Sequence, residues 1–506
     1  MHSDERPRSH LTPPRAWMND PNGPIFVDGR WHLFYQHDPI APRWDRVHWG
    51  HAVTADMVEW QHLPIAISPD DDGPDALGCW SGCVVEEEGV ATMFYTGVVQ
   101  DGPVRRASIL RATSVDGLVT WAKDRSGPAI AGAPAGIAAD AFRDPFVTRD
   151  GTGWVMLVGG GTDAGLGAVL LYRSPDRVRW DFVGPFLSAD DVPRAAGADG
   201  PCWECPQLLR FAGADVLIVS VVDRTPGVRP SHVMAFVGRM SGDRFVVDHA
   251  DQLDMGPDFY APAVVVAPDG RRLIIGWIPE DPPGEASARD WAGSMTYPRV
   301  ISIETDGRLG MALADEILSL RGPRRASGPH VLVESSGPWR RELTSQHVEV
   351  RLTIDPGDAM EVAIELLDSE PDSAEVRVAY QPAERVLSVA RRGIVTVAGR
   401  GSLGATTLPT SAGHRLELRL LIDGSVLELE AAGHTMGTVR LSAMHGPRQA
   451  LTVAAVGGGA VIESIDIWEL TSGADRAAGA QADGTRAPDQ WRIPSRTPSA
   501  KASGER

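Results

Sequence analysis

Long hydrophobic runs are missing from this 506-residue sequence. No stretch approaches the ~20 consecutive apolar residues that a helix needs to cross a bilayer. Residues 1–14 are polar and lack the apolar segment and small-residue cleavage site of a secretory signal. We therefore expect no membrane partner and a cytoplasmic location.

Positive charge is also scarce. The chain has 48 Lys and Arg against 67 Asp and Glu, which gives a formal net charge of -19. Nucleic acids and anionic lipids are bound by basic faces, so neither is expected as a partner.

Cysteine is rare, with only Cys79, Cys83, Cys202 and Cys205 in the chain. Two close pairs raise the possibility of a structural zinc site. The pairs lie far apart in the sequence, however, and their spacings differ. Four reduced, buried thiols are the favoured interpretation, as in a cytosolic protein.

Helical periodicity is nearly absent up to about residue 310, where short strands and turn residues dominate. A turn glycine followed by a β-rich run recurs five times. The glycines are Gly29, Gly89, Gly153, Gly213 and Gly270, at intervals of 60, 64, 60 and 57 residues. A second series of the same period consists of Trp60, Trp121 and Trp180. Radial repetition of several strands is typical of a β-propeller, here with five blades.

The chain exceeds the size of one hydrophobic core, which predicts two domains. Residues 1–312 are assigned to the propeller. Apolar residues at helical spacing before Gly322 and Pro323 predict a linker helix over 313–324. Alternating strands over 325–471 predict a β-sandwich, and residues 472–506 have the composition of a disordered tail. The predicted fold class is all-β.

Three acidic residues stand at one place in the repeat. Asp20, Asp144 and Glu204 each lie nine residues before the turn glycine of their copy. The first strand of each propeller blade lines the central channel, so these carboxylates should converge on one pocket. A ring of carboxylates that only stabilises the channel is the alternative interpretation.

Converging carboxylates suit glycoside cleavage, in which one attacks the anomeric carbon and a second protonates the leaving oxygen. Glu204 is next to Trp203 and Cys205, the apolar neighbours expected of a proton donor. Arg143 is expected to hold the adjacent Asp144 ionised, fit for binding hydroxyl groups rather than donating protons.

Seven short motifs appear in order along the chain: WMNDPNG at 17–23, FYQ at 34–36, WGHA at 49–52, WSG at 80–82, FRDP at 142–145, ECP at 204–206 and DFYA at 258–261. With them the chain resembles glycoside hydrolase family 32, the group of invertases, inulinases, levanases and sucrose-6-phosphate hydrolases. The resemblance covers nearly everything up to residue 471. It implies a five-bladed propeller followed by a sandwich.

The resemblance also implies roles for individual residues. Asp20 looks like the nucleophile, Glu204 the general acid/base and Asp144 the stabiliser of the transition state. The positions that would bind the sugar are Asn19, Gln36, Trp44, Trp80, Ser81, Arg143 and Tyr260. The implied reaction is retaining hydrolysis through a covalent fructosyl-enzyme, and it implies no metal ion and no organic cofactor.

The expected partner is a small sugar substrate, with sucrose preferred. Glu280 and Asp281 form an acidic loop that, at a pocket mouth, would disfavour a phosphate group. Sucrose-6-phosphate hydrolase, a levan or inulin hydrolase and a fructosyltransferase are the alternatives within the family. A sugar-binding propeller without catalysis is a different class, and the presence of all three acids argues against it.

Overall fold

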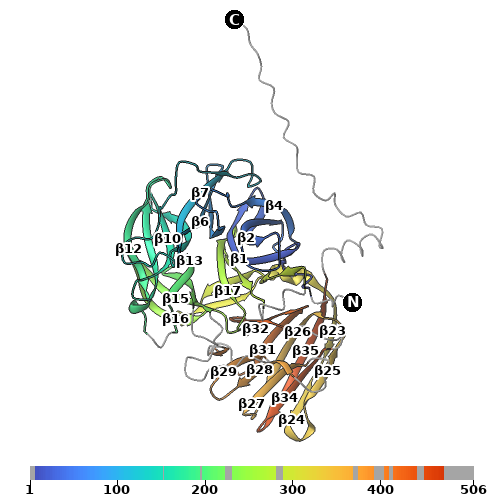
Figure 1. The fold of residues 1–506 in the computed structure, drawn as a ribbon. Helices are drawn as coiled ribbons and strands as arrows, with labels where there is room; N and C mark the ends of the chain where they lie inside the picture. Colours follow the sequence, from blue (N-terminus) through green and yellow to red (C-terminus); the bar gives the residue numbers. More distant parts are fainter. Residues whose placement is uncertain are drawn as a thin grey trace, which may run out of the picture.

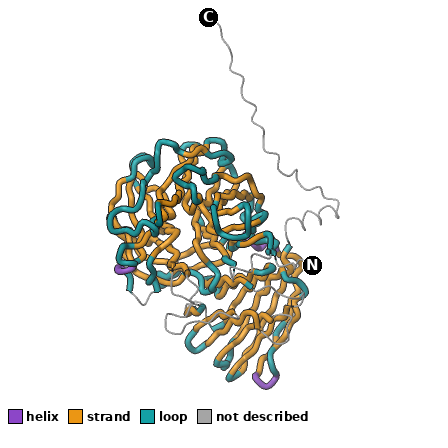
Figure 2. Tube along the Cα trace, in the orientation of Figure 1, coloured by secondary structure: helices purple, strands orange, loops and turns teal. Residues whose placement is uncertain are grey.

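The fold is all-β, as the sequence predicts. The computed structural model describes residues 6–151, 153–193, 197–222, 231–280, 289–367, 374–391, 404–408, 414–441 and 449–471. Figure 2 shows strands throughout both parts of the molecule, and the helices among the described residues are only short turns. The predicted tail over 472–506 lies outside the described residues. In the described part of the chain, no helix is long and apolar enough to cross a membrane.

The N-terminal part is a propeller-like domain, built from five successive meanders of four antiparallel strands (Figure 1). The strands of the first three meanders are β1 (Ala16–Val27), β2 (Arg30–Asp38), β3 (His48–Thr54) and β4 (Gln61–Ile67); β5 (Gly78–Glu87), β6 (Val90–Asp101), β7 (Val104–Ser114) and β8 (Ala122–Lys123); and β9 (Arg143–Asp150), β10 (Gly153–Gly161), β11 (Gly167–Ser174) and β12 (Asp181–Ser188). Those of the last two are β13 (Cys202–Phe211), β14 (Ala214–Val222), β15 (Ser231–Ser241) and β16 (Arg244–Gln252), then β17 (Tyr260–Val266), β18 (Arg272–Ile278), β21 (Arg299–Ile303) and β22 (Leu309–Leu313).

The first strands of the meanders form a closed ring. β1 contacts β5, β5 contacts β9, β9 contacts β13, β13 contacts β17, and β17 returns to β1. Two short additions complete the domain: β19 (Trp291–Ala292) runs parallel to β1, and β20 (Ser294–Met295) pairs with β18. The ring brings the starts of five distant chain segments to one place.

The glycine series has its physical basis in the hairpins between first and second strands. Gly29, Gly89, Gly213 and Gly270 have φ between 77° and 93°, which glycine adopts without steric cost. Gly153 is the exception, because it begins β10 and the left-handed residue of that hairpin is Gly151, with φ of 60°.

The tryptophan series marks a loop. Trp60, Trp121 and Trp180 each pack beside a core cluster between meanders. Four or five residues earlier in each copy, Asp56, Asp116 or Asp176 accepts backbone N–H bonds from the loop that follows it. These aspartates fix the loop conformation through Asx turns.

The connection to the second domain differs from the predicted linker helix over 313–324. Its helical part is a short 3₁₀ helix, η4 (Asp315–Leu320), and β23 (Arg321–Ser327) follows without a break. Gly322 and Pro323 lie inside β23 and not in a hinge. Proline is tolerated there because β23 is an edge strand, and its register is irregular between Arg321 and Arg324.

The C-terminal part is a sandwich of two antiparallel sheets (Figure 1). One sheet contains β23, β24 (His330–Val333), β26 (His347–Asp355), β31 (Leu416–Asp423), β32 (Val426–Ala431), β33 (Thr435–Arg440) and β35 (Gly459–Leu470). The other contains β25 (Trp339–Leu343), β27 (Glu361–Leu367), β28 (Ala374–Gln381), β29 (Val386–Arg391), β30 (Ala405–Thr407) and β34 (Gln449–Val456). Two further 3₁₀ turns are η1 (Ala189–Asp191) and η5 (Glu334–Ser336). Alternate side chains of both sheets fill one apolar core.

Candidate active site

Each strand of the inner ring is interrupted by a β-bulge. The bulged residues are Asp20 in β1, Ser81 in β5, Asp144 and Pro145 in β9, Cys205 and Pro206 in β13, and Ala261 and Pro262 in β17. Bulges re-aim side chains, and a proline that cannot donate to the ladder is compatible with them. Because the five strands form a ring, the bulges place side chains from all of them in one site.

The bulges carry backbone strain. Asp20, Asp144, Cys205 and Ala261 have φ of 28°, 62°, 47° and 46°. Non-glycine residues rarely adopt such angles, and they cluster where a precise geometry serves a function.

Glu204 does not occupy the position of Asp144, contrary to the nine-residue spacing. Arg143 pairs with Gly159, and Glu204 with Ser220, each directly before the bulge of its strand. Cys205 is therefore the residue of β13 that corresponds to Asp144. The spacing misleads because Gly153 already belongs to β10, whereas Gly213 lies in its turn.

Asp20 is held by three polar side chains. Asn19 Nδ2 donates to its Oδ1 at 2.9 Å. Gln36 Nε2 and Ser81 Oγ donate to its Oδ2 at 3.0 Å and 2.6 Å. These donors fix the direction of the carboxylate and favour its ionised form, as an attacking nucleophile requires.

The pKa of Asp20 is nevertheless raised to about 6. Burial is the largest cause, and the nearby Glu204 adds to it, while the bonds from Ser81 and Asn19 act in the opposite direction. Asp20 therefore changes its charge in mildly acidic solution, unlike an ordinary surface aspartate.

Glu204 is held by groups from two neighbouring strands. Arg143 Nε lies 3.1 Å from its Oε1, and the Tyr260 hydroxyl donates to its Oε2 at 2.5 Å. The prediction that Trp203 and Cys205 are apolar neighbours of Glu204 is wrong in part. Trp203 points to the opposite face of β13, as alternation in a strand requires, and packs in the core with its Nε1 bonded to Ala198 O.

For Asp144, the expectation that Arg143 holds its carboxylate ionised fails more clearly. The guanidinium of Arg143 pairs with Glu204, and burial together with the charge of Glu204 raises the pKa of Asp144 to about 7, although Arg143 opposes this. Asp144 accepts the backbone N–H of Cys205 at 3.1 Å. Arg143 thus reaches from β9 to Glu204 on β13.

An aromatic rim adjoins these acids. Trp44 Nε1 lies 3.4 Å from Gln36 Oε1, and its ring meets that of Trp80 edge to face at 5.4 Å. The guanidinium carbon of Arg143 lies 5.7 Å from the Trp80 ring centroid. Trp44 is 40% exposed, which is high for tryptophan, so its ring is available to the C–H face of a sugar. All ten predicted site residues are thus linked in one continuous set of contacts.

Sequence reasoning missed three residues of this set. Cys205 Sγ lies 3.5 Å from Asp144 Oδ2 and 3.9 Å from Asp20 Oδ2, so it separates the two carboxylates. Trp17 and Trp277 meet edge to face at 5.8 Å, and Trp17 Nε1 donates to Asn19 Oδ1 at 2.5 Å. The available signal was that Trp17 and Cys205 belong to the motifs WMNDPNG and ECP, whereas Trp277 belongs to none of the seven motifs.

All four cysteines are free and buried, as the sequence analysis favours. Burial is also the main cause that raises the pKa of the Cys205 thiol well above its usual range. Within the described ranges, no group of three or more His, Cys, Asp or Glu side chains is arranged to hold a metal ion.

The acidic loop does not present Glu280 to the solvent. Glu280 is only 8% exposed. Its carboxylate lies 2.9 Å from Arg440 Nη2 and 3.2 Å from Arg289 Nη1. Asp281 lies outside the described residues. The argument that Glu280 repels a phosphate group is therefore wrong, because its charge is buried and paired.

The arrangement can perform double displacement at an acetal carbon. One carboxylate is aimed by three donors, and a second is shared between a cation and a phenol. The third, Asp144, is buried beside both. Such a set can attack, exchange a proton and hold hydroxyl groups of a sugar ring.

Comparisons with known proteins agree with this geometry. The family models described as Glycosyl hydrolases family 32 N-terminal domain and Glycosyl hydrolases family 32 C terminal match residues 10–312 and 316–469. A sucrose-6-phosphate hydrolase of Escherichia coli is 32% identical over 92% of this chain and 94% of its own length.

Two other similar proteins extend the comparison. A raffinose invertase of Escherichia coli is 35% identical over 65% of this chain and 70% of its own length. Among solved structures, the Bombyx mori β-fructofuranosidase BmSUC1 is 25% identical, with a TM-score of 0.76 over 93% of this chain and 95% of its own.

Proposed function

Because the chain belongs to glycoside hydrolase family 32 and is a glycosidase, we propose that it hydrolyses the β-fructofuranosidic bond of sucrose-6-phosphate with retention of configuration. The observation that carries the reaction type is the convergence of Asp20 and Asp144, in the bulges of β1 and β9, with Glu204, directly before the bulge of β13. The phosphorylated substrate is inferred from the relatives.

In the proposed mechanism, Asp20 attacks the anomeric carbon of the fructosyl group while Glu204 protonates the departing oxygen. A bond forms between Asp20 and the sugar as the glycosidic bond breaks. Glu204 then takes a proton from water, which displaces Asp20 and releases fructose. Asn19, Gln36 and Ser81 aim the nucleophile, and Asp144 holds hydroxyl groups as positive charge develops on the ring.

Two observations support sucrose-6-phosphate over sucrose, the substrate first expected from the sequence. A relative that spans nearly the whole chain carries the name of a sucrose-6-phosphate hydrolase. Glu280 is buried and paired, so its charge is no objection to a phosphate. Sucrose remains the second candidate, since an invertase is also among the similar proteins.

Further parts of the proposal concern the whole molecule. We infer that the five meanders are five blades around one axis, which the closed ring of first strands supports. A cytoplasmic location, where a phosphorylated disaccharide would be retained, is part of the same proposal.

The test is product analysis on equal concentrations of sucrose-6-phosphate, sucrose, inulin and levan. We expect the highest kcat/KM on sucrose-6-phosphate, and loss of at least three orders of magnitude in Asp20→Asn, because the covalent step disappears. A higher kcat/KM on sucrose would reject the phosphorylated substrate alone. No fructose release from any of the four would reject the reaction.

A further inference from the structure

Strand β33 of the sandwich joins the segment that leads into β17 of the propeller-like domain. Met255 N and Asp258 N donate to the carbonyls of Met436 and Thr438 at 2.9 Å and 3.1 Å. Thr438 N in turn donates to Asp254 Oδ1 at 2.9 Å. The last residues before Tyr260, which bonds Glu204, are therefore held by the other domain.

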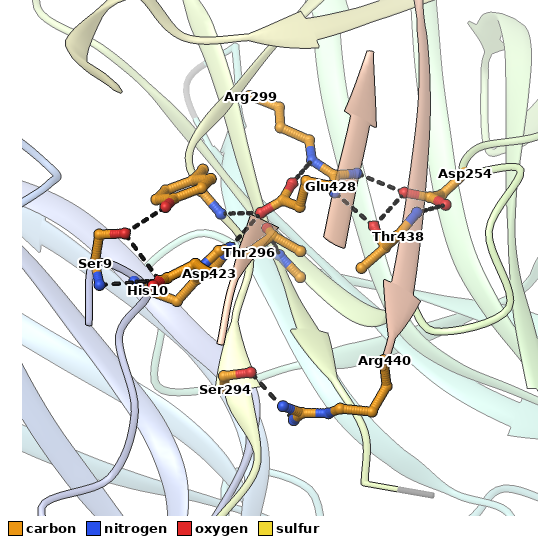
Figure 3. A network of polar contacts seen from close by, with 12 residues as sticks. Ser9, His10, Asp254, Ser294, Thr296, Arg299, Asp423, Glu428, Thr438 and Arg440 are labelled. Carbon is orange, nitrogen blue, oxygen red and sulfur yellow. Dashed lines mark hydrogen bonds and ion pairs between the residues drawn. The ribbon is translucent and has the colours of Figure 1, made fainter. Parts of the chain in front are cut away.

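A buried ionic network makes this junction rigid, and Figure 3 shows Arg299 between Glu428 and Asp254. Arg299 Nη1 donates to Asp254 Oδ2 at 2.6 Å, and its Nε to Glu428 Oε2 at 3.0 Å. All three side chains are 2% exposed or less. Because an unpaired charge in such a place is costly, the pairs hold the two domains in one arrangement.

Arg440, the last residue of β33, reaches further than the rest of this network. Its backbone N–H donates to Asp258 Oδ2 at 2.6 Å. Its guanidinium donates to the carbonyls of Ile278 and Pro279 at 3.0 Å and 3.1 Å and to Ser294 Oγ at 3.2 Å, the last seen in Figure 3. Ile278 is the last residue of β18, Pro279 follows it, and Ser294 lies on β20, which pairs with β18.

Glu280 carries the effect from Arg440 to the strand of Asp20. Its Oε1, 2.9 Å from Arg440 Nη2, also accepts the backbone N–H of Gly293 at 2.9 Å. Gly293 follows β19, whose two residues pair with Ala16 and Trp17 of β1.

The contact at Gly293 leaves no room for adjustment. A Cβ at this residue would lie 1.9 Å from the carbonyl oxygen of Met18, and φ is 87°. A displacement of Gly293 is thus transmitted to the backbone two residues before Asp20.

We propose that Arg440 is a positioning residue for the catalytic carboxylates, which sets β1 through Glu280 and Gly293 and sets Tyr260 through Asp258. The inference rests on the proposed function. The sandwich thereby becomes part of the catalytic apparatus, although none of its described residues belongs to the set of contacts around the three acids.

The test compares Arg440→Met with Arg419→Met, a control within the sandwich. Arg419 pairs with Glu349 at 2.9 Å and has no polar contact with the described residues 278–280 and 289–294. Removing either arginine takes one of two cations from a buried carboxylate, since Glu280 keeps Arg289 and Glu349 keeps Arg321, so both variants should lose stability. Only Arg440→Met should lower kcat, by about tenfold or more, because small misplacements of reacting groups are costly.

A second readout separates positioning from general loosening. Arg440→Met should shift the pH profile of kcat/KM, since Glu204 and Asp20 lose their fixed surroundings, and Arg440→Lys should recover part of kcat. If Arg440→Met does not fold, Glu280→Gln and Ser294→Ala report on the same connection. Equal losses of kcat in Arg440→Met and Arg419→Met would overturn the proposal.

Crystal structures of wild-type protein and Arg440→Met decide the matter independently of substrate. We expect displacement of Gly293 and of the Met18 carbonyl in the variant. Superposition of these atoms on the wild-type positions would refute the positioning role. Failure of the wild-type enzyme to cleave any β-fructoside would instead refute the proposed function.

Discussion

The charge of Asp20 depends on a balance between burial and its hydrogen-bond donors. Burial raises the pKa of Asp20 to about 6, and the Ser81 hydroxyl is the strongest opposing group. A nucleophile must be ionised, so kcat/KM is predicted to fall below about pH 6. Ser81→Ala should move this acidic limb to higher pH, because the bond that favours the ionised form is lost.

The measurement is the pH dependence of kcat/KM for wild type and variant. Ser302→Ala, at an exposed position on β21, serves as the control and should leave the limb unchanged. An acidic limb in Ser81→Ala at or below the wild-type pH would contradict the assignment.

The same raised pKa predicts a conflict between function and stability. A carboxyl group with a higher pKa in the folded than in the unfolded state binds more protons when folded. Its contribution to the free energy of unfolding is therefore lost as pH rises from about 4 through about 6. Asp20→Asn should be inactive yet more stable than wild type at pH 7, by about 1 to 3 kcal/mol.

Urea unfolding at pH 4 and pH 7 measures this difference. The gain in Asp20→Asn should be smaller at pH 4, where the wild-type carboxyl is protonated. A variant less stable than wild type at pH 7 would show that the amide breaks the network of Asn19, Gln36 and Ser81.

At the scale of the element, the unit that builds the site is an inner strand with a bulge. Ala261 has φ of 46° in β17 and is 1% exposed. A β-branched side chain is strained at such an angle, whereas glycine adopts it freely. Ala261→Val is predicted to lose about 1 to 3 kcal/mol of unfolding free energy, and Ala261→Gly much less.

Thermal and urea unfolding of the two variants provide the comparison. Ala261 directly follows Tyr260, so Ala261→Val should also lower kcat by disturbing the bond to Glu204. Equal stability of the valine and glycine variants would show that the bulge relaxes without cost.

At the scale of the whole molecule, His10 joins the N-terminal segment to the sandwich. Its Nδ1 and Nε2 lie 2.7 Å and 3.0 Å from Asp423 and Glu428. Burial lowers the pKa of His10, but the bonds and charges of these two carboxylates outweigh it, so the pKa is raised above 6.5. The other charged or titratable groups facing this cluster are Arg299, His347 and Tyr297.

A histidine with a raised pKa stabilises the folded state fully below its unfolded value of 6.5. The contribution is lost as pH rises through the higher folded value. His10→Gln should therefore be less stable than wild type at pH 6, and the difference should shrink toward pH 9. Urea unfolding at both pH values tests this, and a constant difference would contradict it.

Much of this molecule could be predicted from its residues. The repeats of glycine and tryptophan are visible in the sequence because the meanders need similar turns. Three of them also pack a tryptophan ring beside a core cluster. Asp20, Asp144 and Glu204 could be identified as candidates because each belongs to a short motif with a proline one or two residues after the acid. The predicted helix over 313–324 failed because apolar spacing alone does not distinguish an α-helix from a 3₁₀ turn that leads into an edge strand.

The sequence by itself determined the all-β fold and which acidic residues to consider, since both depend on short-range patterns of turns, alternation and proline. Only the tertiary structure decided that Arg143 pairs with Glu204 and not with Asp144. It also decided that Cys205, and not Glu204, is the residue of β13 that corresponds to Asp144. It also decided that Glu280 is buried against Arg440, 160 residues later in the chain. These partners depend on which strands close the ring and on where the second domain docks. Local sequence patterns contain no information on ring closure or on domain docking.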